Sequence, residues 1–332
     1  MSDSLRGTRV LVTGADGFIG SHLTERLLDE AATVRAFCLY NSDGSLGWLD
    51  DLDWDRRESV DIRLGDIRDA RSVHEAVRGV DVVFHLAALI AIPYSYTAPA
   101  SFVDTNVTGT LNVLEAVRDA DGTRMVHTST SEVYGTPRTI PITESHPLRA
   151  QSPYSATKIA ADKLAESYAL SYDLPVVTLR PFNTYGPRQS ARAVIPTILT
   201  QLLGGASVVH LGALDPRRDF TFVSDTVDGF VRMGTTDLAP GTTLHLGTGS
   251  TVSIGELFEM CRAATGSAAE VMTQPERIRP VESEVKVLVS DPSLARRELG
   301  WEPTVSLEDG IATVAEWLDG RVDPRRAALY HR

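Results

Sequence analysis

A glycine-rich turn near the start of the chain constrains its fold more than any other feature. It reads Gly14-Ala-Asp-Gly17-Phe-Ile-Gly20, and it lies between the strand-like run Arg9–Thr13 and the helix-like stretch Gly20–Glu30. The first glycine permits a tight turn, the second lets the backbone approach a pyrophosphate, and the third lets the helix pack closely on a sheet. The turn has GxxGxxG rather than GxGxxG spacing, and a plain turn is the alternative. We expect a dinucleotide site contacted by Gly14, Gly17, Phe18, Ile19 and Gly20.

Strand-like and helix-like stretches alternate through the first half of the chain. Asp81–Leu86 is apolar without alternation, as expected for a strand whose two faces are both covered by helices. This order predicts an α/β fold with a Rossmann-type, doubly wound parallel sheet. The other expected strands are Thr33–Leu39, Arg124–Ser129 and Val176–Leu179, and the long expected helices are Ser101–Asp119 and Ser155–Tyr172.

The pattern becomes less regular after residue 180. Pro181–Arg192 is rich in proline, glycine, asparagine and arginine, which indicates an ordered functional loop. We expect a dinucleotide-binding domain over 1–180. A smaller α/β domain over 181–332 would be mainly substrate-binding, with some segments returning to the first domain. Its expected elements are helices at Ile195–Leu203 and Ser224–Met233 and strands at Ser207–Leu211 and Thr243–Leu246.

The composition excludes several classes of function. The formal net charge is -12, which argues against nucleic-acid or anionic-membrane binding, although a backbone loop can still bind phosphate. The two cysteines, Cys38 and Cys261, form no disulfide framework, and the eight histidines show no metal-binding spacing. The N-terminal residues resemble neither a signal peptide nor a membrane span. We therefore expect a cytoplasmic protein without a catalytic metal.

The second expected strand lacks the acid that usually binds the ribose hydroxyls of a dinucleotide. That acid belongs about 20 residues after the glycine-rich turn, where this chain has Cys38. Asp43 lies farther on and is a candidate substitute. No arginine follows the strand to pair with a 2′-phosphate, which favours NAD over NADP. Asp66 and Ile67 are candidates to frame the adenine, although Asp66 is equally suited to cap a helix.

Tyr154 and Lys158 form a candidate catalytic pair. They are four residues apart and therefore lie on one face of the expected helix. A phenol is a poor base at neutral pH, but a nearby ammonium and an oxidised nicotinamide ring would both favour the phenolate. The stretch Thr130-Ser131-Glu132 follows a strand and can present a hydroxyl beside the phenol. A solvated surface pair is the alternative.

In these motifs the chain resembles the extended short-chain dehydrogenase/reductase family, which contains sugar-nucleotide epimerases, dehydratases and decarboxylases. The resemblance covers nearly the whole length. The motifs that carry it are GADGFIG (14–20), HLAA (85–88), NVTGTLNVLEA (106–116), STSEVYG (129–135), YSATK (154–158), RPFNTYGPRQ (180–189), RRDFTFVSDTVDG (217–229) and RIRPVESE (277–284).

The resemblance implies a role for each matched residue. Tyr154 would take the proton of the sugar 4-hydroxyl while C4 gives hydride to NAD, with Lys158 and the Thr130 hydroxyl assisting. Leu86, Ala87 and Ala88 would contact the cofactor. The implied contacts to the sugar nucleotide are Asn183 at the diphosphate, Arg218 as the substrate arginine, and Arg279 with Glu282 at the nucleoside or phosphate end. For Arg218 and Arg279, weak surface ion pairs are the alternative.

The residues after Thr130 bear on the fate of the 4-keto sugar. Typical 4,6-dehydratases of the family have Asp-Glu here, and this chain has Ser131-Glu132. The possible base remains, but the stronger acid is missing, which weakens elimination. Thr-Ser-Glu also resembles the UDP-glucuronate decarboxylases. Alternatively, Glu132 only orients a sugar hydroxyl.

Two segments, 40–50 and 186–196, resemble a narrower branch of the family. That branch includes 4,6-dehydratases of UDP-N-acetylglucosamine and the UDP-glucuronate 4-epimerase of moenomycin-type antibiotic biosynthesis. Arg192 lies in the second segment, and a guanidinium there would suit a C6 carboxylate, a diphosphate or solvent. The expected reaction is NAD-dependent 4-epimerisation of UDP-glucuronate to UDP-galacturonate.

Three other functions remain as alternatives. They are a UDP-sugar 4,6-dehydratase, a UDP-glucuronate decarboxylase and an NAD-binding regulator without catalysis. Members of the family commonly dimerise through two helices of each subunit, so we expect a homodimer. The candidate helices are Ser101–Asp119 and Ser155–Tyr172. Leu111, Leu114, Ala161 and Leu164 on them belong either to the interface or to the internal core.

Overall fold

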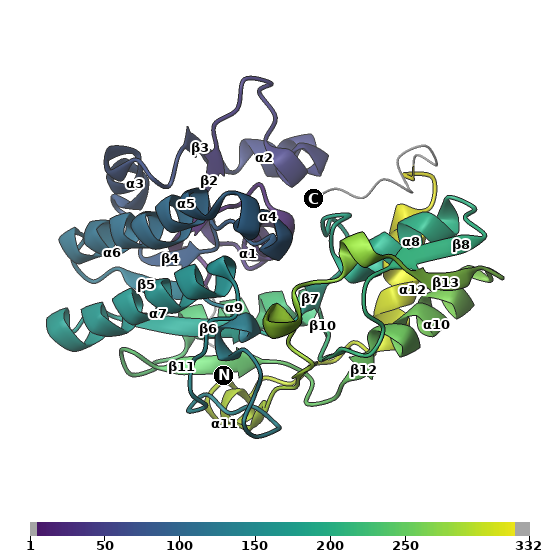
Figure 1. The fold of residues 1–332 in the computed structure, drawn as a ribbon. Helices are drawn as coiled ribbons and strands as arrows, with labels where there is room; N and C mark the ends of the chain where they lie inside the picture. Colours follow the sequence, from purple (N-terminus) through teal and green to yellow (C-terminus); the bar gives the residue numbers. More distant parts are fainter. Residues whose placement is uncertain (1–4, 323–332) are drawn as a thin grey trace.

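A seven-stranded parallel sheet forms the centre of the larger region of the molecule (Figure 1). The structure is a computed structural model, and it describes residues 5–322. The strand order is β11-β6-β5-β4-β1-β2-β3. The bounds are β1 Arg9–Thr13, β2 Thr33–Leu39, β3 Asp61–Gly65, β4 Val82–His85, β5 Arg124–Thr128, β6 Val176–Pro181 and β11 Thr243–Leu246.

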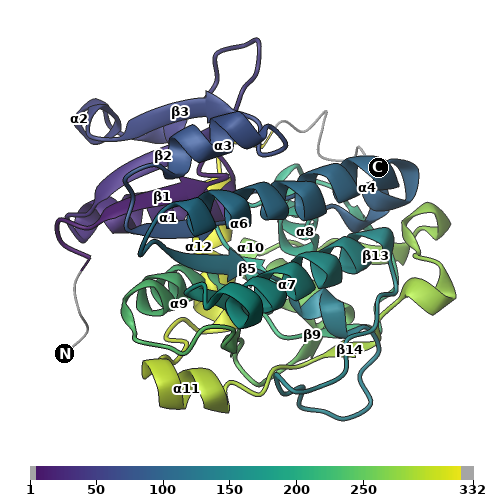
Figure 2. The same cartoon turned by 90° about the vertical axis from the view of Figure 1, so that its left-hand side faces the viewer.

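Helices cover both faces of this sheet, so its strands are apolar on both sides. In β1, Val10 and Val12 belong to one buried cluster and Leu11 to the other. One face is covered by α3 (Ala70–Val77), α6 (Gly109–Asp119) and α7 (Pro153–Tyr172), which lie in front of the sheet in Figure 2. The other face is covered by α1 (Phe18–Asp29) and α9 (Val223–Thr235). The predicted doubly wound Rossmann-type fold is confirmed.

The expected helix over 101–119 is interrupted. It consists of α5 (Pro99–Phe102), a π-helical turn η2 (Val103–Thr108) and α6. Inside the turn, the Asn106 side chain is buried, accepts the Leu89 N–H at 2.8 Å and donates to the Leu89 carbonyl at 2.9 Å. Such π-turns are frequent at functional sites. Here the turn lets the Asn106 side chain bind both the N–H and the carbonyl of Leu89, in the loop after β4.

The smaller C-terminal region is a mixed α/β unit with its own core. Three helices, α8 (Val194–Leu203), α10 (Ile254–Thr265) and α12 (Leu307–Leu318), pack on one another and on the strand pair β8–β13 (Val208–Leu211 and Glu270–Thr273). The remaining strands are β7 Thr184–Tyr185, β10 Thr221–Phe222, β9 Arg217–Arg218, β12 Val252–Ser253 and β14 Val287–Leu288, and the short helices are η1 Gly47–Asp51, α2 Trp54–Glu58, α4 Ile92–Thr97 and η3 Ser131–Tyr134.

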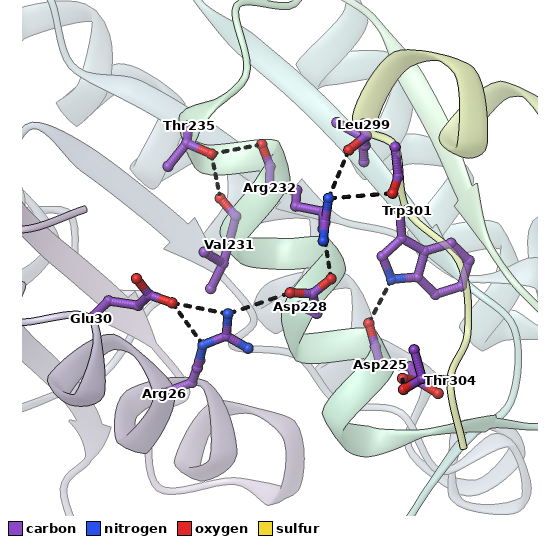
Figure 3. A network of polar contacts seen from close by, with 11 residues as sticks. Arg26, Glu30, Asp225, Asp228, Val231, Arg232, Thr235, Leu299, Trp301 and Thr304 are labelled. Carbon is purple, nitrogen blue, oxygen red and sulfur yellow. Dashed lines mark hydrogen bonds and ion pairs between the residues drawn. The ribbon is translucent and has the colours of Figure 1, made fainter. Parts of the chain in front are cut away.

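Segments late in the chain pack with the Rossmann-type region. β11 forms the edge of its sheet beside β6. Figure 3 shows how α9 is attached: Asp228 pairs with Arg26 of α1 at 3.4 Å and with Arg232 at 2.6 Å. Arg232 then donates to the carbonyl at the end of α11 (Ser293–Leu299), and Trp301 donates to the Asp225 carbonyl at 2.8 Å. These contacts join the two halves of the chain.

The two long helices carry most of their apolar side chains inside the molecule. Leu114 and Ala161 are fully buried in the single chain, which assigns them to the internal core, while Leu111 and Leu164 are half-buried. Leu170, near the end of α7, is 79% exposed. No helix within residues 5–322 is both long and apolar enough to cross a bilayer.

Candidate active site

The glycine-rich turn between β1 and α1 has no room for side chains at two of its glycines. Gly14 has a φ of +70°, and a Cβ there would lie 2.9 Å from the Ala87 backbone. A Cβ on Gly20 would lie 2.1 Å from the Gly14 carbonyl oxygen. The Thr13 hydroxyl accepts the backbone N–H groups of Leu86 and Ala87, which fixes the second loop against the first. The bare backbone at the start of α1, where Phe18 and Ile19 lie, fits a dinucleotide pyrophosphate.

Tyr154 lies buried in the first turn of α7. The start of this helix is fixed by a capping box between Ser152 and Ser155 and by Pro153, which suits the first helical position. Burial raises the pKa of the Tyr154 phenol above its ordinary value, while a hydrogen bond with the Thr130 side chain opposes that rise. Thr130 also accepts the Glu132 N–H at 3.2 Å, which holds its hydroxyl at the end of β5.

Lys158 lies one turn further along the same face of α7. Its ammonium is buried and donates to the main-chain oxygen of Thr128 at 2.6 Å. Burial lowers the pKa of Lys158 to about 8, against the opposing charge of Asp162. Lys158 is therefore still mainly protonated at neutral pH and places a positive charge one helical turn from Tyr154.

Asp162 lies one further turn along α7 from Lys158. Its buried carboxylate accepts hydrogen bonds from Ser129 Oγ at 2.7 Å, His127 Nε2 at 3.1 Å and Arg180 Nη2 at 3.0 Å. Burial alone would raise the pKa of Asp162, but the His127 hydrogen bond and the charge of Arg180 lower it to about 2. Asp162 was not among the residues predicted from the sequence, although its spacing of four from Lys158 placed it on the same helix face.

Ser131 and Glu132 occupy the short turn η3 after β5. Ser131 is buried and Glu132 is half-buried. The negative charge of Glu132 adds to the burial that raises the pKa of Tyr154, and it opposes the burial that lowers the pKa of Arg218. Glu132 therefore lies close enough to act electrostatically on both residues, and Arg218 lies near the same centre.

Arg218 pairs with a carboxylate, Glu284, that was not predicted from the sequence. Its guanidinium is buried and pairs with Glu284 at 3.0 Å, and Arg279 approaches the same oxygen at 3.9 Å. Burial lowers the pKa of Arg218. Glu282 is exposed, and its main-chain carbonyl accepts the Gln151 side-chain amide at 2.7 Å. Both glutamates occur in the motif over 277–284, and the sequence alone could not decide which one faces the arginines.

Asn183 and Arg192 lie in the segment that follows β6. The Asn183 amide donates to the Asp219 carbonyl at 3.0 Å, which joins this segment to the strand that carries Arg218. Arg192 is exposed, and within residues 5–322 its guanidinium forms no ion pair. Its backbone N–H donates to Ser190 Oγ at 3.3 Å. The roles of both residues toward a substrate stay predictions.

Two other candidate cofactor residues, Asp66 and Ile67, lie just after β3. The Asp66 carboxylate binds the Arg68 backbone and guanidinium, while Asp69 caps α3 by accepting the Ser72 N–H at 2.7 Å. Ile67 is buried. Asp66 therefore does not cap α3, and its place beside an adenine stays a prediction.

Comparison with known proteins adds to this geometry. A family model described as GDP-mannose 4,6 dehydratase matches residues 11–314. The UDP-glucose 4-epimerase of Mycolicibacterium smegmatis is 35% identical over 322 residues, which is 93% of this chain and 98% of that protein. Both an epimerase and a dehydratase description thus match most of the chain.

Two solved structures also match nearly the whole chain. MoeE5, solved in complex with UDP-glucuronic acid and NAD, is 31% identical with a TM-score of 0.83, covering 95% of this chain and 100% of its own. DesIV, the dTDP-glucose 4,6-dehydratase of Streptomyces venezuelae solved with NAD bound, is 32% identical with a TM-score of 0.84, covering 96% and 99%. MoeE5 is one of several neighbours at this level, so the narrower branch expected from the sequence is not singled out. The chain belongs to the extended short-chain dehydrogenase/reductase family of sugar-nucleotide epimerases and dehydratases.

Proposed function

We propose that the chain is an NAD-dependent UDP-sugar 4-epimerase that converts UDP-glucuronate to UDP-galacturonate. The observation that carries the proposal is the buried pair Tyr154 and Lys158 with the half-buried Thr130, a group suited to oxidation at C4, beside a serine where the dehydratase acid would stand. MoeE5, which was solved with UDP-glucuronic acid and NAD, supports the choice of substrate.

The residues of the chain would act in a fixed order. Tyr154, as phenolate, accepts the proton of the sugar 4-hydroxyl and later returns it. Thr130 hydrogen bonds the phenol. The buried ammonium of Lys158, one helical turn away, is proposed to favour the phenolate. Bound NAD supplies the hydride acceptor for C4 and the donor for its return. The 4-keto sugar would turn over in the site and receive hydride on its opposite face. Because Tyr154 returns the proton to the C4 oxygen, epimerisation needs no additional acid.

Arg192 is proposed to bind the C6 carboxylate of the sugar. Its guanidinium is exposed and forms no ion pair within the described residues, so it is free to take a carboxylate bidentately. Arg218 and Arg279 are proposed to bind the diphosphate or nucleoside end, where they share Glu284 in this structure. A homodimer formed through α6 and α7 is also proposed.

A 4,6-dehydratase is the second candidate function. The charge of Glu132 raises the pKa of Tyr154, so Glu132 lies near the phenol proposed to act at C4, and a base for the C5 proton would need to lie in the same neighbourhood. A serine hydroxyl in place of the usual aspartate is, however, a poor proton donor to a leaving hydroxyl. The buried Ser131 therefore favours the epimerase.

Products from a panel of UDP-sugars test this choice. We expect UDP-glucuronate to give a product of unchanged mass, which proton NMR identifies as UDP-galacturonate, with UDP-glucose as a poorer substrate. Loss of carbon dioxide from UDP-glucuronate would contradict the proposal in favour of a decarboxylase. Loss of water from UDP-N-acetylglucosamine would favour the dehydratase. Tight NAD binding without any conversion would favour a regulator.

A further inference from the structure

The usual ribose-binding acid is missing, and its position in this structure cannot bind a ribose. In Rossmann-type folds an acidic residue at the end of β2 accepts the hydrogen bond of the ribose 2′-hydroxyl. Cys38 stands there with its thiol fully buried, and burial raises the pKa of that thiol to about 12. Asp43, the substitute considered above, lies in an exposed turn four residues beyond β2 and donates its N–H to Asn41 Oδ1.

A different carboxylate reaches the end of β2. Asp16, the third residue of the glycine-rich turn, accepts the Leu39 N–H through Oδ2 at 3.3 Å. The negative charge of Asp16 also acts on Cys38, which places the carboxylate beside the residue that replaces the usual acid. The Asp16 carboxylate therefore lies at the end of β2 close to Cys38, although Asp16 itself belongs to the turn after β1.

Asp16 is fixed in this position by the segment that follows β2. Its carbonyl accepts the Trp48 N–H at 3.1 Å, and a Cβ on Gly47 would lie 2.4 Å from that carbonyl oxygen. The side chain is half-buried, and no cation within residues 5–322 forms an ion pair with it. A half-buried carboxylate without a cationic partner is free to accept hydroxyl hydrogen bonds.

We propose that Asp16 binds the adenosine ribose hydroxyls of NAD and sets the preference for NAD over NADP. The inference rests on the proposed cofactor. A carboxylate accepts hydrogen bonds from two neighbouring hydroxyls through its two oxygens. A phosphate ester carries a charge of roughly -1.5 to -2 at neutral pH, so a 2′-phosphate placed beside Asp16 would be repelled.

The Asp16→Asn variant tests the role because it keeps an acceptor for the Leu39 N–H and removes only the charge. Protein freed of nucleotide is titrated with NAD and with NADP by calorimetry. A hydrogen bond to a charged group contributes about 1.5–3 kcal/mol, so the Kd for NAD should rise roughly 10- to 100-fold. The Kd for NADP should stay unchanged or fall. Asp43→Asn is the matched control and should change neither value.

The ratio of the two Kd values separates binding from structure. An equal rise for NAD and NADP in Asp16→Asn would mean a structural role and would overturn the inference. An unchanged ratio, or a changed ratio in Asp43→Asn alone, would overturn it as well. If the wild-type chain binds NAD and converts the sugar while Asp16→Asn behaves like it, only this inference fails. If the wild-type chain binds neither dinucleotide, the proposed function fails too.

Discussion

Replacing Tyr154 by phenylalanine is expected to lower the turnover number about 10³-fold, because general acid–base catalysis contributes 10²- to 10⁴-fold. The substitution removes only the hydroxyl that meets Thr130 and leaves the ring packed against Phe102. The circular dichroism spectrum and the affinity for NAD should therefore change little. Initial rates with UDP-glucuronate, measured at saturating substrate, give the comparison.

Tyr172→Phe is the matched control for this variant. Tyr172 is the last residue of the same helix, so it lies far from the proposed reaction centre in the first turn. Its side chain is 54% exposed. Its turnover number should stay within about twofold of the wild-type value. A Tyr154→Phe variant that also stays in this range would show that another group takes the proton.

The Asp162→Asn variant is expected to lower the free energy of unfolding by about 3–5 kcal/mol, as when one partner of a buried ion pair is removed. Arg180 is only 6% exposed and would lose the sole carboxylate with which it pairs among the described residues. Lys163→Ala is the control on the same helix. Lys163 forms an exposed pair with Glu166, which contributes at most about 1 kcal/mol. Urea denaturation measures both values, and equal losses would contradict the account.

The same substitution should change how stability depends on pH. The pKa of Asp162 is about 2 in the folded chain, against an ordinary value of 3.8, so the unfolded chain binds the proton more readily. This carboxylate therefore stabilises the fold above about pH 4, and the contribution is lost as pH falls toward 2. At 1.36 kcal/mol per pKa unit the lost contribution is about 2 kcal/mol. Asp162→Asn should lose stability less steeply than the wild type over this range.

The strands of the Rossmann-type sheet could be predicted closely from the sequence. The bounds of β1, β2 and β11 are those expected from their apolar and β-branched runs. Such strands are buried on both faces and lie between glycine- and proline-rich turns, so local sequence defines them. β3 was not expected because it lies at the sheet edge and is partly exposed, which leaves a weak apolar pattern.

The parts of the site that depend on long-range contacts could not be predicted in this way. Glu284 rather than Glu282 meets Arg218 because the path of the chain between residues 218 and 284 decides which carboxylate arrives. Asp16 reaches the end of β2 only once the two loops have packed together. The π-turn around Asn106 likewise depends on a partner in the loop after β4. Motifs located these segments, but the contacts within them arise from tertiary structure.

Hydride transfer at C4 is the central claim, and one labelled substrate tests it directly. UDP-glucuronate carrying deuterium at C4 is incubated with the purified enzyme, and the product is analysed by mass spectrometry and proton NMR. We predict UDP-galacturonate of unchanged mass with the deuterium still at C4, because the hydride leaves and returns within one site. Loss of the deuterium to solvent, or a product that has lost carbon dioxide, would contradict the account.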